Sequence, residues 1–188
     1  MRQLPNLITI FRIALVVPTG WCLAYGDYGT ALLLMAVAGV SDAIDGALAR
    51  RYAWTTPFGA FADPLADKLL IGVTFLVLLL QGHVPLWLAA IVLARDVVIV
   101  GGVMLYSLLI ERIDIAPTFI SKANTAVQIV MLVLLLVQLL EAGTLSSLAA
   151  WLVNPWGFAL VGLLGIASGL DYVITWSYRA FRTSRSSE

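Results

Sequence analysis

The chain has 188 residues, of which 61% are hydrophobic and only 12% are charged, and its mean hydropathy is +0.98. Soluble domains carry roughly 25% charged residues, so this composition excludes both an ordinary soluble domain and a disordered chain. The 11 Lys and Arg residues are balanced by 11 Asp and Glu residues, which excludes nucleic-acid binding through excess positive charge. The composition predicts a protein embedded in a lipid bilayer.

Six apolar segments are long enough to cross a bilayer core, which needs about 20 residues per helix. Turn-like or polar residues separate the segments, and the loops between them are too short to hold a soluble domain. The segments are 7–25, 30–48, 59–80, 86–109, 117–140 and 155–178. We therefore predict one all-α integral membrane domain over residues 1–188, built as a bundle of six transmembrane helices.

The basic residues predict the orientation, because short cytoplasmic loops collect Lys and Arg. Most Lys and Arg residues flank the N-terminus, the second and fourth loops and the C-terminus, whereas the first, third and fifth loops contain none. Both termini are therefore expected at the cytoplasmic face, with the basic tail 179–188 on anionic headgroups. The short loops and the lack of a transit-like segment favour a bacterial inner membrane.

A carboxylate cluster interrupts the apolar sequence where the second predicted helix ends and the third begins. Helical periodicity places on one face of the second helix Asp42, Asp45, Gly46 and Ala49, and on one face of the third Gly59, Asp63 and Asp67. Four carboxylates among apolar segments are costly and repel one another. Clustered hard oxygen ligands suit Mg²⁺, Mn²⁺ or Ca²⁺, and two such ions clamp a diphosphate during displacement. We predict a two-metal site, with a solvated charge cluster at a helix end as the structural alternative.

These residues resemble the signature of the CDP-alcohol phosphatidyltransferases, Asp-x2-Asp-Gly-x2-Ala-Arg-x8-Gly-x3-Asp-x3-Asp. Every specified position from Asp42 to Asp67 matches it. The resemblance implies a membrane enzyme that takes CDP-diacylglycerol as donor, depends on two divalent cations, Mg²⁺ or Mn²⁺, and assembles as a homodimer.

The resemblance also implies a role for each signature position. The implied metal ligands are Asp42, Asp45, Asp63 and Asp67. The positions implied to contact CDP and its diphosphate are Gly46, Ala49, Arg50 and Gly59. In this interpretation the cations neutralise the diphosphate, and Asp67 acts as general base on the incoming hydroxyl.

Basic residues within the apolar segments indicate where an acceptor could bind. A cation in apolar surroundings needs an anionic or dipolar partner. We therefore predict that Arg12, Arg95 and Lys122 surround an acceptor phosphate. The structural alternative for Arg95 is a mutually neutralising pair with Asp96.

Two local sequences bear on the acceptor. Segment 5–12 resembles the opening that the phosphatidylglycerophosphate synthases share with the CMP-forming cardiolipin synthases, whereas segment 117–128, which follows 94–97, is most similar to the cardiolipin synthases. Asn124 stands where the phosphatidylglycerophosphate synthases usually carry a second Lys, so a cation expected to hold glycerol 3-phosphate is missing. This departure favours phosphatidylglycerol as acceptor, with cardiolipin and CMP as products.

Two other functions stay open. A phosphatidylglycerophosphate synthase would use glycerol 3-phosphate as acceptor with the same donor. A cation transporter, which belongs to another class, would bind its ion at the intramembrane Asp residues. Internal symmetry would favour a transporter, but the Asp pattern is not repeated in the second half of the chain.

Overall fold

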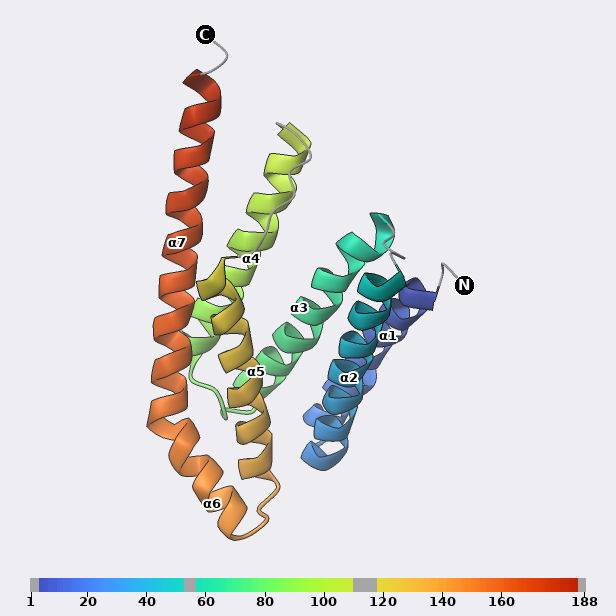
Figure 1. The fold of residues 1–188 in the computed structure, drawn as a ribbon. Coiled ribbons are helices and arrows are strands. Elements are labelled where there is room, and N and C mark those ends of the chain that lie inside the picture. Colours follow the sequence, from blue (N-terminus) through green and yellow to red (C-terminus); the bar gives the residue numbers. More distant parts are fainter. Residues whose placement is uncertain (1–3, 53–56, 110–117, 186–188) are drawn as a thin grey trace. The chain divides into compact units, whose positions relative to one another are not determined.

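The structure, a computed structural model, describes residues 4–52, 57–109 and 118–185, and all regular elements in these ranges are helices (Figure 1). The elements are α1 (Leu4–Ala24), α2 (Tyr28–Tyr52), α3 (Pro57–Leu80), α4 (Leu86–Leu109), α5 (Phe119–Leu139), α6 (Thr144–Trp151), the π-helical segment η1 (Leu152–Gly157) and α7 (Phe158–Arg185). The six long helices coincide with the six predicted apolar segments. The short helix α6 was not predicted.

The last helical stretch begins earlier than the sequence predicts. Ser146 of α6 closes the turn from α5, because its hydroxyl accepts a hydrogen bond of 2.7 Å from the N–H of Ala142 and donates one of 2.8 Å to the carbonyl of Val137. Within η1 the backbone leaves helical geometry at Asn154, with φ −119° and ψ 115°. The residue before a proline prefers this extended region, so Pro155 kinks the stretch instead of starting it.

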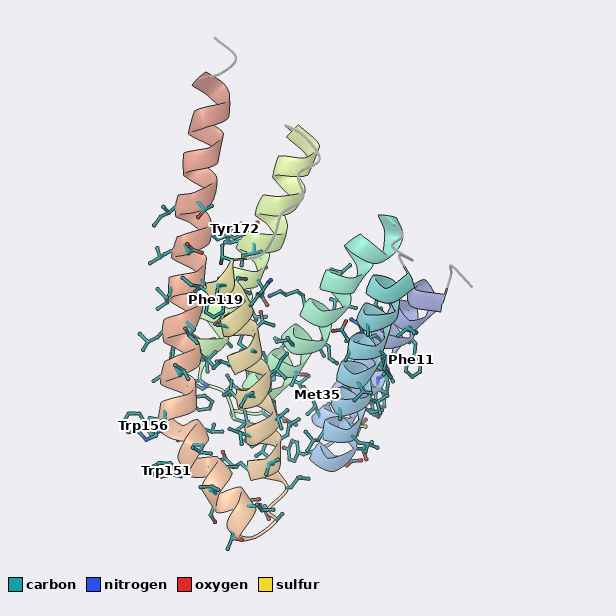
Figure 2. The ribbon with its side chains drawn as sticks, viewed as in Figure 1. Phe11, Met35, Phe119, Trp151, Trp156 and Tyr172 are labelled. Carbon is teal, nitrogen blue, oxygen red and sulfur yellow. The ribbon has the colours of Figure 1, made fainter. Side chains whose placement is uncertain are left out.

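The described helices carry long apolar stretches and exposed apolar side chains. Two helical stretches are long and apolar enough to cross a bilayer, Phe119–Leu139 and Thr144–Thr175. Shorter apolar stretches are Ile8–Ala24, Tyr28–Ile44 and Lys68–Leu80. Large apolar side chains lie exposed on these helices, and Trp151 and Trp156 project outward beside the kink (Figure 2). Exposed apolar area of this extent marks a surface that contacts lipid or another protein. The crossing of all six helices and the position of the termini stay predictions.

One compact unit contains Met1–Pro85 and Leu135–Ala149, and within it α1 packs against both α2 and α3 (Figure 1). Its core is apolar, with Leu23, Phe75 and Leu78 fully buried. The side-chain nitrogen of Gln81 donates a hydrogen bond of 2.7 Å to the carbonyl of Leu23, which ties the end of α3 to the end of α1. Helix α1 is therefore the element that holds α2 and α3 together.

The turn between α1 and α2 carries a helix cap. Gly26 has a φ of 78°, a conformation that L side chains rarely adopt. The Asp27 carboxylate then accepts a hydrogen bond of 3.1 Å from the backbone N–H of Thr30. Hydrogen bonds from the side chain and the backbone of Thr30 hold the pKa of Asp27 below its ordinary value. The cap fixes the residue at which α2 starts.

A second compact unit contains Leu86–Leu134 and Ala150–Glu188, and within it α4 packs against α7 (Figure 1). Glycines make this contact close. A Cβ added at Gly162 would lie 2.7 Å from Trp87 Cζ3, and one added at Gly165 would lie 2.9 Å from Ile91 Cγ2. Small residues at helix contacts let two backbones approach in this way.

Substitution of Gly165 by alanine should destabilise the second unit. The new Cβ would overlap Ile91, and overpacking of this kind costs about 1–3 kcal/mol. We expect Gly165→Ala to lower the melting temperature of the purified protein in detergent. Gly101→Ala on α4 is the matched control, because nothing lies within 4 Å of its added Cβ. Equal melting temperatures for the two variants would show that the α4–α7 contact tolerates the methyl group.

Candidate functional site

The signature residues lie on two helices that keep the predicted spacing. Helix α2 runs unbroken to Tyr52, and α3 begins at Pro57, so the face assignments made from helical periodicity hold for the backbone. The surroundings of six signature residues are not described, namely those of Asp45, Ala49, Arg50, Gly59, Asp63 and Asp67. Asp42 and Gly46 are described. Metal binding by the four aspartates and the contacts to CDP therefore stay predictions.

Asp42 receives a cation from the neighbouring helix α1. The Nη1 atom of Arg12 lies 2.7 Å from Oδ1 of Asp42. The Arg12 side chain is 1% exposed, whereas that of Asp42 is 46% exposed. The buried guanidinium of Arg12 thus contacts one oxygen of Asp42, a signature carboxylate that is partly exposed.

The contact between Arg12 and Asp42 was not predicted from the sequence, where Arg12 was grouped with Arg95 and Lys122 around an acceptor phosphate. A signal for the observed pair was present in the sequence. Helix α1 contains no acidic residue, so a buried arginine on it must take its carboxylate from another helix. Whether Arg12 also meets a phosphate stays a prediction.

The described part of the site fits a divalent cation in its chemistry. Asp42 offers hard oxygen donors, and its side chain is 46% exposed although Oδ1 contacts Arg12. Such oxygens are the ligands of Mg²⁺ and Mn²⁺. The residues present therefore fit a metal, and the remaining ligands would come from the signature positions on α2 and α3. The solvated charge cluster stays the structural alternative, because the surroundings of the other three aspartate side chains are not described.

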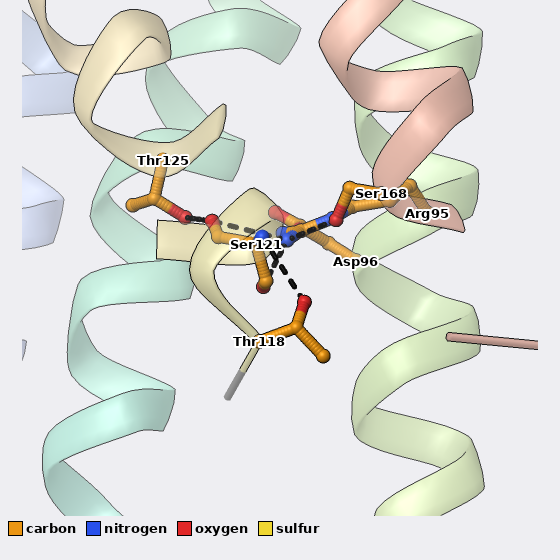
Figure 3. Close-up of polar contacts among 6 residues, drawn as sticks. All are labelled: Arg95, Asp96, Thr118, Ser121, Thr125 and Ser168. Atoms are coloured by element: carbon orange, nitrogen blue, oxygen red, sulfur yellow. Dashed lines mark hydrogen bonds and ion pairs between the residues drawn. The ribbon is translucent and has the colours of Figure 1, made fainter. Parts of the chain in front are cut away.

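A second polar cluster surrounds Arg95 of α4 (Figure 3). Arg95 Nη1 lies 2.6 Å from Asp96 Oδ1, and Nη2 donates hydrogen bonds of 2.9 Å to Ser168 Oγ and of 3.4 Å to the carbonyl of Ser121. The hydroxyl of Ser121 accepts a further hydrogen bond from Nη2. Arg95 is 4% exposed and Asp96 is 8% exposed. The mutually neutralising pair, which was the structural alternative, is therefore what the structure contains.

The first turn of α5 is organised to meet this arginine. Thr118 Oγ1 accepts a hydrogen bond of 3.3 Å from the Ser121 N–H, and Thr125 Oγ1 donates one of 3.1 Å to the Ser121 carbonyl. These contacts orient Ser121 toward Arg95, while the adjacent Lys122 is exposed. Sequence reasoning assigned no role to Ser121 or to Ser168, although a buried guanidinium with several donors needs such acceptors.

Comparison with known proteins identifies the family. A family model described as CDP-alcohol phosphatidyltransferase matches residues 2–167. The chain belongs to this family. The matched region contains the whole CDP-alcohol phosphatidyltransferase signature, from Asp42 to Asp67, and the Arg95–Asp96 pair.

Relatives in the CDP-alcohol phosphatidyltransferase family carry two kinds of name. A Drosophila melanogaster protein, "Probable cardiolipin synthase (CMP-forming)", is 35% identical over 69% of this chain and 45% of its own length. The human "Cardiolipin synthase (CMP-forming)" is 29% identical over 97% of this chain and 58% of its own. A Pseudomonas fluorescens "CDP-diacylglycerol--glycerol-3-phosphate 3-phosphatidyltransferase" is 35% identical over 91% of this chain and 88% of its own. The chain thus spans about half the length of the fly and human relatives.

Removal of the Arg95 charge should destabilise the protein strongly. Arg95→Met would leave Asp96 without its cation at a buried position, and breaking a buried ion pair costs about 3–5 kcal/mol. We expect a marked fall in the melting temperature. Lys122→Met, which removes an exposed charge on α5, should leave it unchanged.

The double variant Arg95→Met/Asp96→Leu should recover part of this stability, because no buried charge then remains at the pair. If Arg95→Met melts at the same temperature as Lys122→Met, the pair does not stabilise the fold.

Proposed function

We propose that this chain transfers a phosphatidyl group from CDP-diacylglycerol to an alcohol and releases CMP. The observation that carries the proposal is the complete family signature, from Asp42 to Asp67, on two helices that preserve its spacing. Membership of the family supports a transferase over a cation transporter. The partly exposed carboxylate of Asp42 is consistent with a phosphate-binding metal site.

The donor would be held at the ends of α2 and α3. The proposed ligands of two divalent cations, Mg²⁺ or Mn²⁺, are Asp42, Asp45, Asp63 and Asp67. Bound there, the cations would neutralise the diphosphate and make CMP a better leaving group. Arg50 would contact the diphosphate, and the nucleotide would lie against Gly46, Ala49 and Gly59. Small residues at these positions leave the helix backbone open to close approach by a ligand.

The transfer step needs a base and an in-line displacement. Asp67 would take the proton from the acceptor hydroxyl. The hydroxyl oxygen would then form a bond to the phosphorus that carries the diacylglycerol, while the bond from that phosphorus to the CMP oxygen breaks. Arg12 would keep the carboxylate of Asp42 in place during this step, because it already holds one of its oxygens in the described structure.

We propose phosphatidylglycerol as the acceptor, which makes the products cardiolipin and CMP. The headgroup phosphodiester of this lipid carries one negative charge, whereas the phosphate of glycerol 3-phosphate carries up to two and needs more cations to hold it. At position 124 the chain has a buried neutral amide, and the nearby Arg95 already pairs with Asp96. The names of the fly and human relatives agree with this choice.

Glycerol 3-phosphate is the second candidate acceptor. The Pseudomonas fluorescens relative named for that acceptor matches over 88% of its own length, far more than the fly and human proteins do. For this candidate, the exposed Lys122 would be the described cation available to the phosphate.

The proposed setting is a bacterial inner membrane. The single domain would cross the bilayer with six helices, as a homodimer, with both termini and the signature at the cytoplasmic face. Support comes from the distribution of Lys and Arg among the loops and from the exposed apolar side chains of the long helices.

The acceptor can be tested directly. Purified protein with CDP-diacylglycerol and Mn²⁺ or Mg²⁺ is offered phosphatidylglycerol or glycerol 3-phosphate in separate reactions, and CMP and the lipid product are measured. We expect cardiolipin from phosphatidylglycerol and little product from glycerol 3-phosphate. Product from glycerol 3-phosphate alone would establish the second candidate instead.

The base can be tested by Asp67→Asn, which keeps the size of the side chain and removes its basicity. We expect the rate of transfer to fall by about 10²–10⁴, with an unchanged melting temperature. Asp27→Asn is the control, because position 27 precedes the opposite end of α2 and Asn also caps helices. Normal turnover by Asp67→Asn would remove Asp67 from the role of base.

A further inference from the structure

Two amide side chains inside the second unit lack the hydrogen bonds that buried amides normally make. Asn124 and Gln128 of α5 are both fully buried. Neither the nitrogen nor the oxygen of either side chain has a hydrogen-bond partner within the part of the chain that the structure describes. Burial of an amide without a partner is unfavourable, and native structures contain few such groups. Two such amides one helical turn apart indicate a hydrogen-bonding partner that is not part of the chain.

The two amides continue the polar face of α5 that begins at Ser121. Positions 121, 124 and 128 lie on one face of a helix, at spacings of three and four residues. Asn124 lies next to Gly165 of α7. Its Oδ1 atom is 3.9 Å from the position that a Cβ atom added at Gly165 would occupy. Ser168, which accepts hydrogen bonds from Arg95, lies one turn further along α7. The amides and the Arg95 cluster therefore belong to one polar region between α4, α5 and α7.

The chemistry of this region selects a neutral ligand that both donates and accepts hydrogen bonds. Each amide offers an NH₂ donor and a carbonyl acceptor and carries no charge. The neighbouring cation Arg95 is already held by Asp96, Ser121 and Ser168. An anion would find no free positive charge at the amides, whereas hydroxyl groups match them in both roles.

We propose that Asn124 and Gln128 bind the hydroxyl groups of the glycerol in the acceptor, an inference that rests on the proposed function. Phosphatidylglycerol and glycerol 3-phosphate share these hydroxyls, so the amides recognise the polyol and not the phosphate. Both amides are fully buried in the described structure, so the side chains around them must move apart for the hydroxyls to reach them.

Near-isosteric apolar variants test the proposal. Asn124→Leu and Gln128→Met keep the approximate volume of each side chain and remove its hydrogen-bonding groups. We expect each to raise the KM for the acceptor about tenfold or more and to leave the KM for CDP-diacylglycerol unchanged. The melting temperature should stay equal or rise, because unpaired buried polar atoms have been removed. A purely structural role would change stability without separating the two KM values.

Thr125→Val is the matched control on the same helix. Its hydroxyl is already satisfied by the Ser121 carbonyl, so both KM values should match those of the wild type. Unchanged acceptor KM in Asn124→Leu and Gln128→Met would overturn the proposal and would assign ordered water to the amides.

Each acceptor is measured separately. Wild-type transfer to glycerol 3-phosphate alone would contradict phosphatidylglycerol as acceptor, and the amide variants are then judged by their KM for glycerol 3-phosphate. A wild-type protein that transfers to neither acceptor would contradict the proposed function and this inference together.

Discussion

Pairing of charge inside apolar helices is the constraint on which the rest of this structure depends. Arg12 and Arg95 are both almost completely buried, and each lies within hydrogen-bonding distance of a carboxylate. An isolated charge in such surroundings is costly, so each arginine dictates which helix face must carry its partner. In a bilayer this matters more than in water, because lipid tails are as apolar as Leu and apolar contacts alone discriminate poorly between helix orientations.

The two arginines solve the constraint in different ways. Arg95 finds its carboxylate on the next residue of its own helix and uses its remaining donors to bind Ser121 of α5 and Ser168 of α7. Arg12 finds its carboxylate on a neighbouring helix and so links α1 to the signature on α2. In the Arg95 arrangement, the cation and its carboxylate are both buried. In the Arg12 arrangement, the side chain of Asp42 stays 46% exposed, and a residue that binds a ligand needs such exposure.

The sequence predicted those features that depend on local composition. Long apolar runs marked the six long helices, and the spacing of the aspartates placed them on shared helix faces, because both patterns are properties of a single helix. The contact between Arg12 and Asp42 depends on which helices pack together, and the sequence alone does not show this. Helix α6 was missed because Pro155 resembled a helix start, whereas Ser146 closes a turn earlier in the chain. The buried amides on α5 were visible as polar residues, but their lack of partners is a property of the folded chain.

In the predicted crossing of the bilayer, the kink before α7 would set the position of that helix along the membrane normal. Trp151 and Trp156 flank the kink and are each 63% exposed, and exposed Trp side chains favour the interface between lipid headgroups and hydrocarbon. Helix α7 has 28 residues, a length of about 42 Å at 1.5 Å per residue, whereas the hydrocarbon core is about 30 Å thick. In the predicted crossing along the membrane normal, a helix of this length that started at one interface would extend past the other by several residues. The sequence places arginines in these last turns, where they would resist movement of α7 along the membrane normal.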